Sequence, residues 1–272
     1  MSEVVQMRVN DGVALLTLNR PDRLNAWTAE MEHAYFALLE QCARDEDVRV
    51  IVVTGAGRGF CAGADMQELQ AIGDGTMTPS AEALERRPQT FPQSIPKPII
   101  AAVNGACAGI GLVQALMCDL RFAAEGAKLT TAFSRRGLVA EHGISWLLPR
   151  LVGPARALDL LLSGRVVFAE EAYELGLVNR VLAPDRLLDT TLDYARELVV
   201  NCSPASMATM KRQVYADLQR ELPDALAEAD RLMLASFAAP DFVEGVTSFV
   251  ERRDPRFAAL APDGTRAGAL GA

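Results

Sequence analysis

Two segments of the chain join an apolar run to a glycine-rich loop and then to a stretch with helical character. The first is VIVVTGAGRGFCAGAD, residues 50–65, and the second is IIAAVNGACAGIG, residues 99–111. A loop that enters a helix carries backbone N–H groups without intrahelical partners, and the helix dipole adds positive charge there. Two such loops could direct two N–H groups at one carbonyl oxygen, as acyl chemistry requires. The residues alone leave open that both loops are only tight turns.

The first loop also contains Gly57-x-Gly59-x-x-Ala62, which is similar to the glycine fingerprint of dinucleotide-binding proteins. That fingerprint needs a second strand, about 20 residues further on, that ends in an acid for the ribose. Asp74 lies at the right distance, but no strand pattern leads to it. The chain also lacks the Gly-Lys-Ser/Thr of a phosphate-binding P-loop. The sequence therefore disfavours a nucleotide cofactor.

Hydrophobic spacing and turn residues predict the elements that position these loops. Strands are expected over residues 13–18, 48–53, 99–103, 120–123 and 128–131. Helices are expected from the capping residue Thr28 to Cys42, over 65–72, up to Cys118, over 154–163 and 168–175, and over almost all of 184–252. The proline-containing stretch 73–98 is expected to be irregular. The pattern is that of a strand-rich core of about 200 residues with a helical C-terminal part.

The composition excludes several classes of function. A net charge of −8 disfavours nucleic-acid binding, and an anionic ligand would need a local cluster of basic residues. No apolar run approaches the roughly 20 residues of a membrane helix, and the first residues lack the pattern of a signal peptide. Five cysteines without a C-x-x-C motif indicate reduced, mostly buried thiols in a cytoplasmic protein and no structural zinc: Cys42, Cys61, Cys107, Cys118 and Cys202.

Five motifs, in their order and spacing, resemble the crotonase family of enoyl-CoA hydratases and isomerases over roughly residues 5–260. They are NRPDRLNAW, GRGFCAGADMQEL, PKPIIAAVNGACAGIGLVQALMCDLRFAAEGAKL, GLVAEHGISWLLPRLVG and SGRVVFAEEAYELGLVNRV. The resemblance implies an α/β fold, a crotonase-type spiral of ββα units with a helical C-terminal trimerisation region. It implies an acyl-CoA-binding core over 1–200, a helical region over 201–260 and a disordered tail over 261–272.

The same resemblance implies the parts of the site. The two oxyanion donors are expected to be the N–H groups of Ala64 and Ile110, and a backbone donor survives although the family usually has glycine at position 110. Asp65 is expected to cap a helix or fix the loop. Coenzyme A is expected only as part of the substrate thioester, bound by a homotrimer or homohexamer. Its expected contacts are Arg23, Leu24, Ala26, Ala62, Asp65, Met66 and Gly109, and its candidate phosphate ligands are Arg23, Arg58, Lys97, Lys211, Arg252 and Arg253.

The resemblance also bears on the reaction. Hydration of an enoyl thioester calls for two carboxylates, but Val113 and Phe133 stand where hydratases carry glutamate. Glu141 stands where isomerase branches carry their catalytic acid. Its apolar sequence neighbours are expected to desolvate it and so to raise its pKa: Leu138, Val139, Ala140 and Ile144. A Δ3 to Δ2 enoyl-CoA isomerase with Glu141 as the proton shuttle is therefore predicted.

Other interpretations of Glu141 stay open. The side chain could cap the helix expected to begin near Gly143. It could activate water in a hydratase, with or without His142, or it could attack covalently, as the aspartate of the dehalogenase branch does. The chain could also be a non-catalytic acyl-CoA-binding relative. The sequence assigns no role to Arg135 and Arg136.

Overall fold

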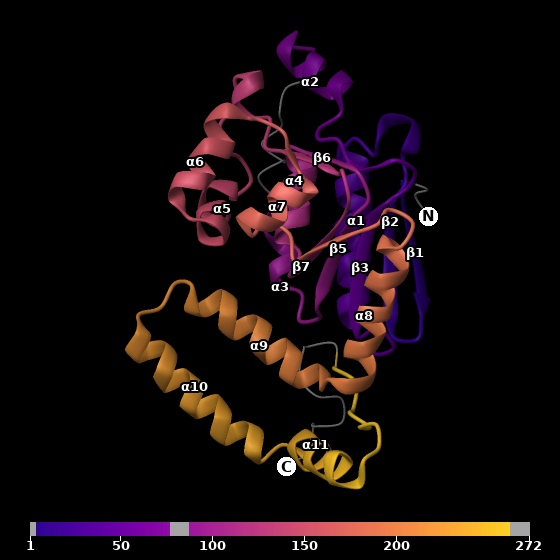
Figure 1. The fold of residues 1–272 in the computed structure, drawn as a ribbon, viewed down its shortest axis with the longest axis vertical. Coiled ribbons are helices and arrows are strands. Elements are labelled where there is room, and N and C mark those ends of the chain that lie inside the picture. The colour runs from indigo at the N-terminus through magenta and orange to yellow at the C-terminus, as the bar shows by residue number, and fades with distance from the viewer. Residues whose placement is uncertain (1–3, 77–86, 262–272) are drawn as a thin grey trace.

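A computed structural model of the protein describes residues 4–76 and 87–261 (Figure 1). In this part of the chain the larger sheet has the strand order β1-β2-β3-β5-β7-β10, and all neighbours are parallel except β1 and β2. These strands are β1 (Val5–Asn10), β2 (Val13–Leu18), β3 (Val50–Gly55), β5 (Ile99–Val103), β7 (Leu120–Ala124) and β10 (Arg180–Leu182).

A smaller sheet of short strands has the order β4-β6-β8-β9. Its strands are β4 (Gly59–Cys61), β6 (Ala106–Ala108), β8 (Lys128–Thr130) and β9 (Val167–Phe168). The hydrophobic pattern did not predict β4 or β6, because three residues are too few to show a period. Each glycine-rich segment is therefore a strand, a short second strand and then a helix, which agrees with the ββα unit that the resemblance implied.

Helices surround the two sheets. The sequence placed most of them within two residues, and Thr28 caps α1 by accepting a hydrogen bond from the N–H of Met31 at 3.2 Å. The helices of the core are α1 (Ala29–Arg44), α2 (Met66–Gly73), α3 (Phe91–Ser94), α4 (Ile110–Met117), α5 (Ile144–Val152), α6 (Pro154–Ser163), α7 (Ala169–Leu175) and α8 (Leu187–Asn201). The stretch expected to be irregular contains α3, and part of it lies outside the described residues.

The central strands form the core. Every residue of β3 and β5 is buried, because α8 packs against both strands from one face of the sheet. Their continuous apolar runs reflect this burial on both faces. The predicted strand over 48–53 lies two residues further along, and the turn before it is closed by the N–H of Val48, which bonds the carbonyl of Asp45 at 3.1 Å.

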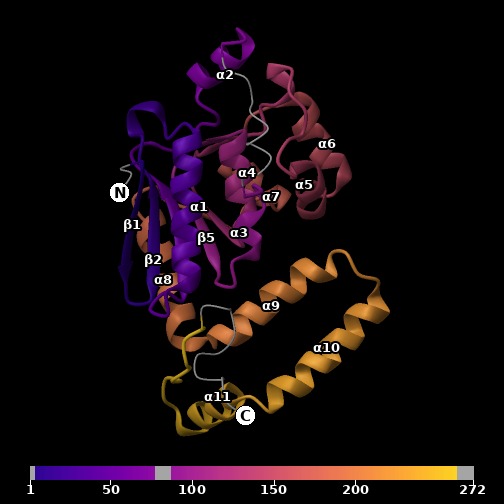
Figure 2. The same cartoon turned by 180° about the vertical axis from the view of Figure 1, so that it is seen from behind.

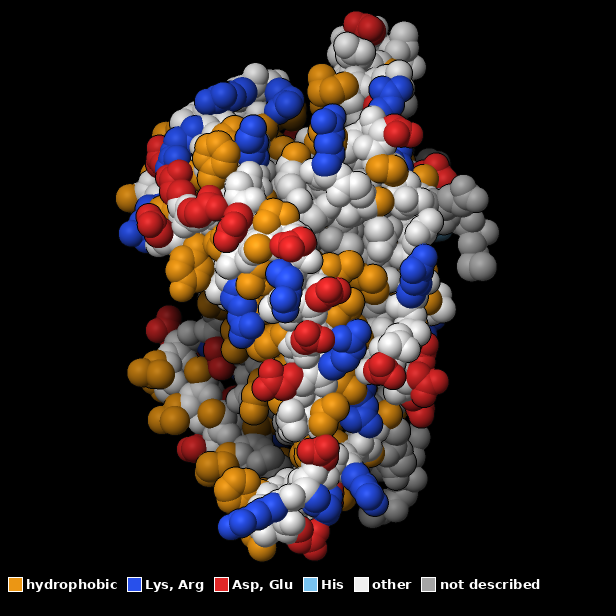
Figure 3. Space-filling view, turned by 45° about the vertical axis from the view of Figure 1, so that its right-hand side comes forward, with side chains coloured by type: hydrophobic (Ala, Val, Ile, Leu, Met, Phe, Trp, Pro, Cys, Tyr) orange, Lys and Arg blue, Asp and Glu red, His pale blue; other side chains and the backbone are white. Residues whose placement is uncertain are grey.

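Three further helices, α9 (Pro204–Asp217), α10 (Leu222–Phe237) and α11 (Pro240–Glu251), lie beyond the sheets in both ribbon views (Figures 1 and 2). They carry many exposed apolar side chains, and Figure 3 shows hydrophobic side chains gathered on this lower part of the molecule. No helix among the described residues is both long and apolar enough to cross a membrane. Nearly all of the predicted tail, 261–272, lies outside the described residues.

Two of the expected phosphate ligands are structural instead. The Lys97 side chain is only 1% exposed, and its ammonium donates to the carbonyls of Cys42 and Asp45 at the C-terminus of α1. Burial lowers the pKa of Lys97. The Lys211 ammonium is 2.8 Å from the carboxylate of Asp119 and anchors α9 to the core. The prediction that these two lysines bind phosphate is therefore wrong, since neither ammonium is free for a ligand.

The five cysteines are all free thiols in the structure. Cys42, Cys61, Cys107 and Cys118 are buried, and Cys202 is half-buried. The prediction of mostly buried thiols is confirmed. Burial raises the pKa of Cys61 to about 12, so this thiol stays protonated at neutral pH.

We predict that Lys97→Met lowers the free energy of unfolding by about 1–3 kcal/mol, because it leaves two buried carbonyls without a donor. Urea unfolding followed by circular dichroism measures this change. Lys128→Met is the matched control, since Lys128 is exposed, and it should change the free energy of unfolding by less than about 0.5 kcal/mol. Equal effects of the two substitutions would contradict the structural role of Lys97.

Candidate active site

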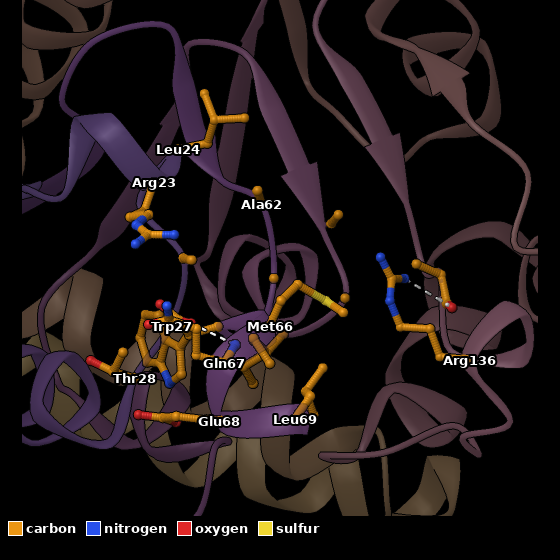
Figure 4. Close-up of a pocket in the computed structure, with 18 of the residues that line it drawn as sticks. Arg23, Leu24, Trp27, Thr28, Ala62, Met66, Gln67, Glu68, Leu69 and Arg136 are labelled. Atoms are coloured by element: carbon orange, nitrogen blue, oxygen red, sulfur yellow. Dashed lines mark hydrogen bonds between the residues drawn. The ribbon is translucent and has the colours of Figure 1, made fainter. Parts of the chain in front are cut away.

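One cavity of about 730 Å³ collects the residues that the sequence placed in the site. Figure 4 shows its wall, with Arg23 and Leu24 on one side, Met66 and Leu69 of α2 in the middle and Arg136 across from them. Each predicted site residue lines this cavity: Arg23, Leu24, Ala26, Ala62, Ala64, Asp65, Met66, Gly109, Ile110 and Glu141. Segments up to 118 residues apart along the chain thus meet at one place, from Arg23 to Glu141.

The two glycine-rich loops meet because their short strands pair. β4 and β6 run parallel, with Gly59 opposite Ala106 and Cys61 opposite Cys107. Parallel strands end at the same edge, so the loops that follow them emerge side by side. A Cβ on Gly111 would lie 2.3 Å from the carbonyl oxygen of Cys61, which shows how tightly the start of α4 packs on β4.

Each proposed donor follows a glycine with a left-handed backbone. Gly63 has φ +103° and Gly109 has φ +50°, conformations that residues with a Cβ rarely adopt. A Cβ on Gly109 would lie 3.9 Å from the Cα of Gly63, so the peptide groups before Ala64 and Ile110 are neighbours in space. Among the residues that the structure describes, neither of these N–H groups has a hydrogen-bond acceptor. Both donors are available to a ligand in the cavity.

Asp65 fixes the first loop. Its carboxylate accepts a hydrogen bond from the N–H of Gln67 at 2.9 Å, which caps α2, and lies 2.8 Å from the guanidinium of Arg20. These two contacts lower the pKa of Asp65, the backbone hydrogen bond most and the arginine next. The predicted capping role of Asp65 is confirmed. With both oxygens engaged in this way, the carboxylate holds the loop in place.

Two asparagines hold the loop that joins β3 to β4. The buried amide of Asn25 donates to the carbonyls of Ala56 and Gly59, and that of Asn104 donates to the carbonyls of Gly55 and Gly57, all within 3.0 Å. These side chains satisfy carbonyls that strand pairing leaves open. The Gly57-x-Gly59-x-x-Ala62 pattern thus forms a turn that leads into a strand. A dinucleotide fingerprint would instead lead directly into a helix.

Glu141 lines the cavity together with residues of both glycine-rich loops. Its side chain is 32% exposed, and its carboxylate is 3.5 Å from Nε2 of His142. The cap of α5 is Gly143, which is in the left-handed conformation, and no side chain accepts from the first turn of this helix. The capping interpretation of Glu141 is therefore wrong. The prediction that apolar sequence neighbours desolvate the Glu141 carboxylate is wrong in part, because Val139 is 76% exposed while Ile144 is buried.

His142 has φ +59°, an uncommon backbone conformation for a residue with a side chain. Burial lowers its pKa, and the charges of Glu141 and Glu32 oppose that shift. A neutral imidazole beside a carboxylate can accept or donate a hydrogen bond within the cavity. Strain of this kind persists only where the surrounding structure imposes it.

Apolar side chains stand at the two positions where the resemblance expects hydratase glutamates. Val113 is fully buried within α4, and Phe133 is buried and lines the cavity. Neither can transfer a proton. In the wall formed by residues 131–142, Glu141 is the one carboxylate.

The sequence did not reveal Glu32 of α1, which also lines the cavity. Its carboxylate accepts hydrogen bonds from Nε1 of Trp27 at 3.3 Å and from Nε2 of Gln89 at 2.6 Å. The Gln89 side chain accepts in turn from the buried amide of Gln114 at 2.6 Å. An acid in the first turn of a helix is ordinary, so its sequence context gives no signal of this position.

Comparison with known proteins agrees with this geometry. A family model described as enoyl-CoA hydratase/isomerase matches residues 8–259. The chain belongs to this family, the crotonases. It is 38% identical over 261 residues to 1,2-epoxyphenylacetyl-CoA isomerase of Escherichia coli K12, which covers 94% of this chain and 99% of the relative.

Solved crotonase structures share the fold. A probable enoyl-CoA hydratase/isomerase from Mycobacterium abscessus is 33% identical with a TM-score of 0.86, over 93% of this chain and 98% of that one. An enoyl-CoA hydratase from Mycobacterium marinum is 50% identical with a TM-score of 0.69, over 80% of this chain and 100% of that one. The predicted family and fold class are thereby confirmed.

For this crotonase, the four arginines among the expected phosphate ligands divide into two groups. Arg23 and Arg58 line the cavity, on the loops before α1 and between β3 and β4. Arg252 and Arg253 do not line it, and Arg253 pairs with Glu244. Within the described chain, Arg23 and Arg58 remain as candidates for the phosphates of an acyl-CoA.

We predict that Gly111→Ala lowers kcat/KM at least about 10-fold, because the new Cβ forces α4 away from β4 and displaces the N–H of Ile110. Steady-state kinetics with an enoyl-CoA substrate measures the loss. The control is Gly245→Ala in α11, where the new Cβ makes ordinary contacts with Phe257. Full activity of Gly111→Ala would show that the loops need not pack this closely.

We predict that Asp65 contributes to the pH dependence of stability. Its pKa is lower in the folded protein than in the unfolded chain, so its contribution is present above the unfolded pKa of about 3.9 and is lost as the pH falls below it. Asp65→Asn keeps a side chain that can cap a helix and removes the charge. The free energies of unfolding of wild type and variant, measured between pH 3 and 7, should therefore approach each other at low pH. A difference that stays constant over this range would contradict the prediction.

Proposed function

We propose that this crotonase is an enoyl-CoA isomerase that converts Δ3-enoyl-CoA into Δ2-enoyl-CoA. One observation carries the proposal. Glu141 is the one carboxylate of residues 131–142, which line the same cavity as Ala64 and Ile110, while Val113 and Phe133 occupy the positions where the resemblance expects hydratase acids. A single base suffices to move a proton between two carbons of one substrate, whereas hydration uses two groups.

In the proposed reaction the thioester oxygen accepts hydrogen bonds from the N–H groups of Ala64 and Ile110. Glu141 removes a proton from C2, and the electron pair moves through the thioester to give a dienolate whose charge lies on that oxygen. The protonated Glu141 then returns the proton at C4, and the double bond ends between C2 and C3. The step needs no metal and no second acid.

The other acids of the first loop and of α1 are engaged elsewhere. Asp65 pairs with Arg20, and Glu32 accepts hydrogen bonds from Trp27 and Gln89. The side chain of Glu141, in contrast to those of Asp65 and Glu32, meets only His142, at 3.5 Å, in the described structure. It is free to approach the α-carbon of a bound substrate.

A hydratase is the second candidate, and the pair of Glu141 and His142 favours it. A carboxylate and an imidazole 3.5 Å apart could activate one water molecule and supply a proton. The relatives carry both kinds of name, since the Escherichia coli protein is named an isomerase and the Mycobacterium marinum protein a hydratase. A non-catalytic acyl-CoA-binding relative is the third.

We also propose that the protein forms a homotrimer or homohexamer in the cytoplasm. The exposed apolar residues of α9–α11 support an assembly, since a monomer would leave them in water. They include Met210, Val214, Leu222, Leu226, Phe237, Val243, Phe249 and Val250. The free thiols agree with a reducing compartment.

The proposed function is tested by offering a Δ3-enoyl-CoA and a Δ2-enoyl-CoA separately and following the absorbance of the conjugated thioester. We expect the absorbance to rise with the first and to stay constant with the second in water. A fall with the second would establish a hydratase. No change with either, together with tight acyl-CoA binding, would establish a binding protein.

Glu141→Gln should lower kcat at least about 100-fold because it removes the base, while the affinity for CoA stays the same. Glu174→Gln, at an exposed position of α7, is the control and should keep full activity. Isothermal titration with CoA separates lost chemistry from lost folding. Wild-type rates for Glu141→Gln would overturn the assignment.

A further inference from the structure

Three arginines line the cavity, and one of them has no place in the binding of CoA as proposed above. Arg23 and Arg58 belong to the loops near the start of the chain, whereas Arg136 ends the short turn η3 (Ser134–Arg136). Figure 4 shows Arg136 across the pocket from Arg23, with Met66 and Leu69 between them. Arg136 is therefore not part of one phosphate-binding cluster with Arg23.

The guanidinium of Arg136 has most of its donors unused. Its Nη1 donates to the backbone carbonyl of Ala132 at 3.3 Å, a long hydrogen bond drawn as a dashed line in Figure 4. No carboxylate of the described residues pairs with it. A guanidinium has five N–H donors in a planar fork that fits a carboxylate bidentately.

The neighbouring arginine shows what a structural role at this turn looks like. The Nε of Arg135 donates to the carbonyl of Ser163 at 2.9 Å, and its side chain packs beside Gly164. Arg135 does not line the cavity. The turn thus directs one arginine onto α6 and the other along the cavity wall.

The position of Arg136 identifies the part of the ligand that it would meet. It shares its segment with Phe133, Leu138 and Glu141, which line the same wall. Given the proposed function, the thioester lies at Ala64 and Ile110, the CoA extends towards Arg23, and the acyl group extends along the opposite wall. Arg136 therefore faces the acyl group.

We propose that Arg136 binds a carboxylate at the far end of the acyl chain, so that the preferred substrates are enoyl-CoA half-thioesters of dicarboxylic acids. A net charge of −8, with Glu32, Glu68 and Glu141 on the cavity wall, would repel such an acyl group without a local positive charge. The arginine supplies that charge and a directional contact. A purely aliphatic acyl chain gives it no partner.

The test uses two Δ3-enoyl-CoA substrates of equal chain length, one ending in a carboxylate and one in a methyl group. Wild type should have the higher kcat/KM for the first. Arg136→Met should lower that value about 10- to 100-fold and leave the second unchanged or raised. Arg135→Met is the matched control and should change neither value.

Two results would overturn the proposal. The first is no preference of wild type for the carboxylate. The second is an equal loss on both substrates in Arg136→Met that disappears with pantetheine thioesters, which would assign Arg136 to the CoA phosphates.

A binding experiment keeps the inference separate from the reaction. The dissociation constants of the two corresponding saturated acyl-CoA thioesters are measured on wild type and Arg136→Met by calorimetry. Tighter binding of the carboxylate form by wild type, lost in the variant, supports the inference even if no isomerase activity is found. Equal affinities overturn it even if the isomerase activity is present.

Discussion

The site depends on the parallel pairing of two three-residue strands, β4 and β6. This pairing places two loops side by side, and Gly63 and Gly109 then turn the following peptide groups so that their N–H atoms lack partners within the described chain. Unpaired backbone donors in a half-buried site are unfavourable unless a ligand or water satisfies them. The larger sheet and the asparagine contacts at the β3–β4 turn supply the rigidity that keeps these donors open.

Several contacts around the two glycine-rich loops hold these loops in place. Asn25, Asn104 and the pair of Arg20 with Asp65 each bridge segments that are distant in sequence and close in space. Gly111 permits a contact that any side chain would prevent. Lys97 and Lys211 donate to a carbonyl and a carboxylate of the core, those of Cys42 and Asp119, so their positive charges are not available at the cavity.

Much of this could be predicted from the sequence, and the failures have physical reasons. Strands and helices with clear periods, such as β2 and α1, were placed within a residue or two, and the predicted site residues all line one cavity. The three-residue strands had no period to show. The lysines were misassigned because a sequence does not reveal which charge a tertiary contact will bury. Glu32 was missed because its importance arises from Gln89, a residue 57 positions away.

The turn from Ser134 to Arg136 and the strained His142 lie within one short stretch, together with Glu141. In the proposed reaction the two glycine-rich loops give the thioester only backbone N–H groups, those of Ala64 and Ile110. The proposed site thus separates a binding function of the backbone from a chemical function of the side chains. On the proposed roles of Glu141 and Arg136, exchanging residues 133–142 as a block between crotonases would transfer reaction type and acyl preference together, and the recipient would keep its own binding of CoA.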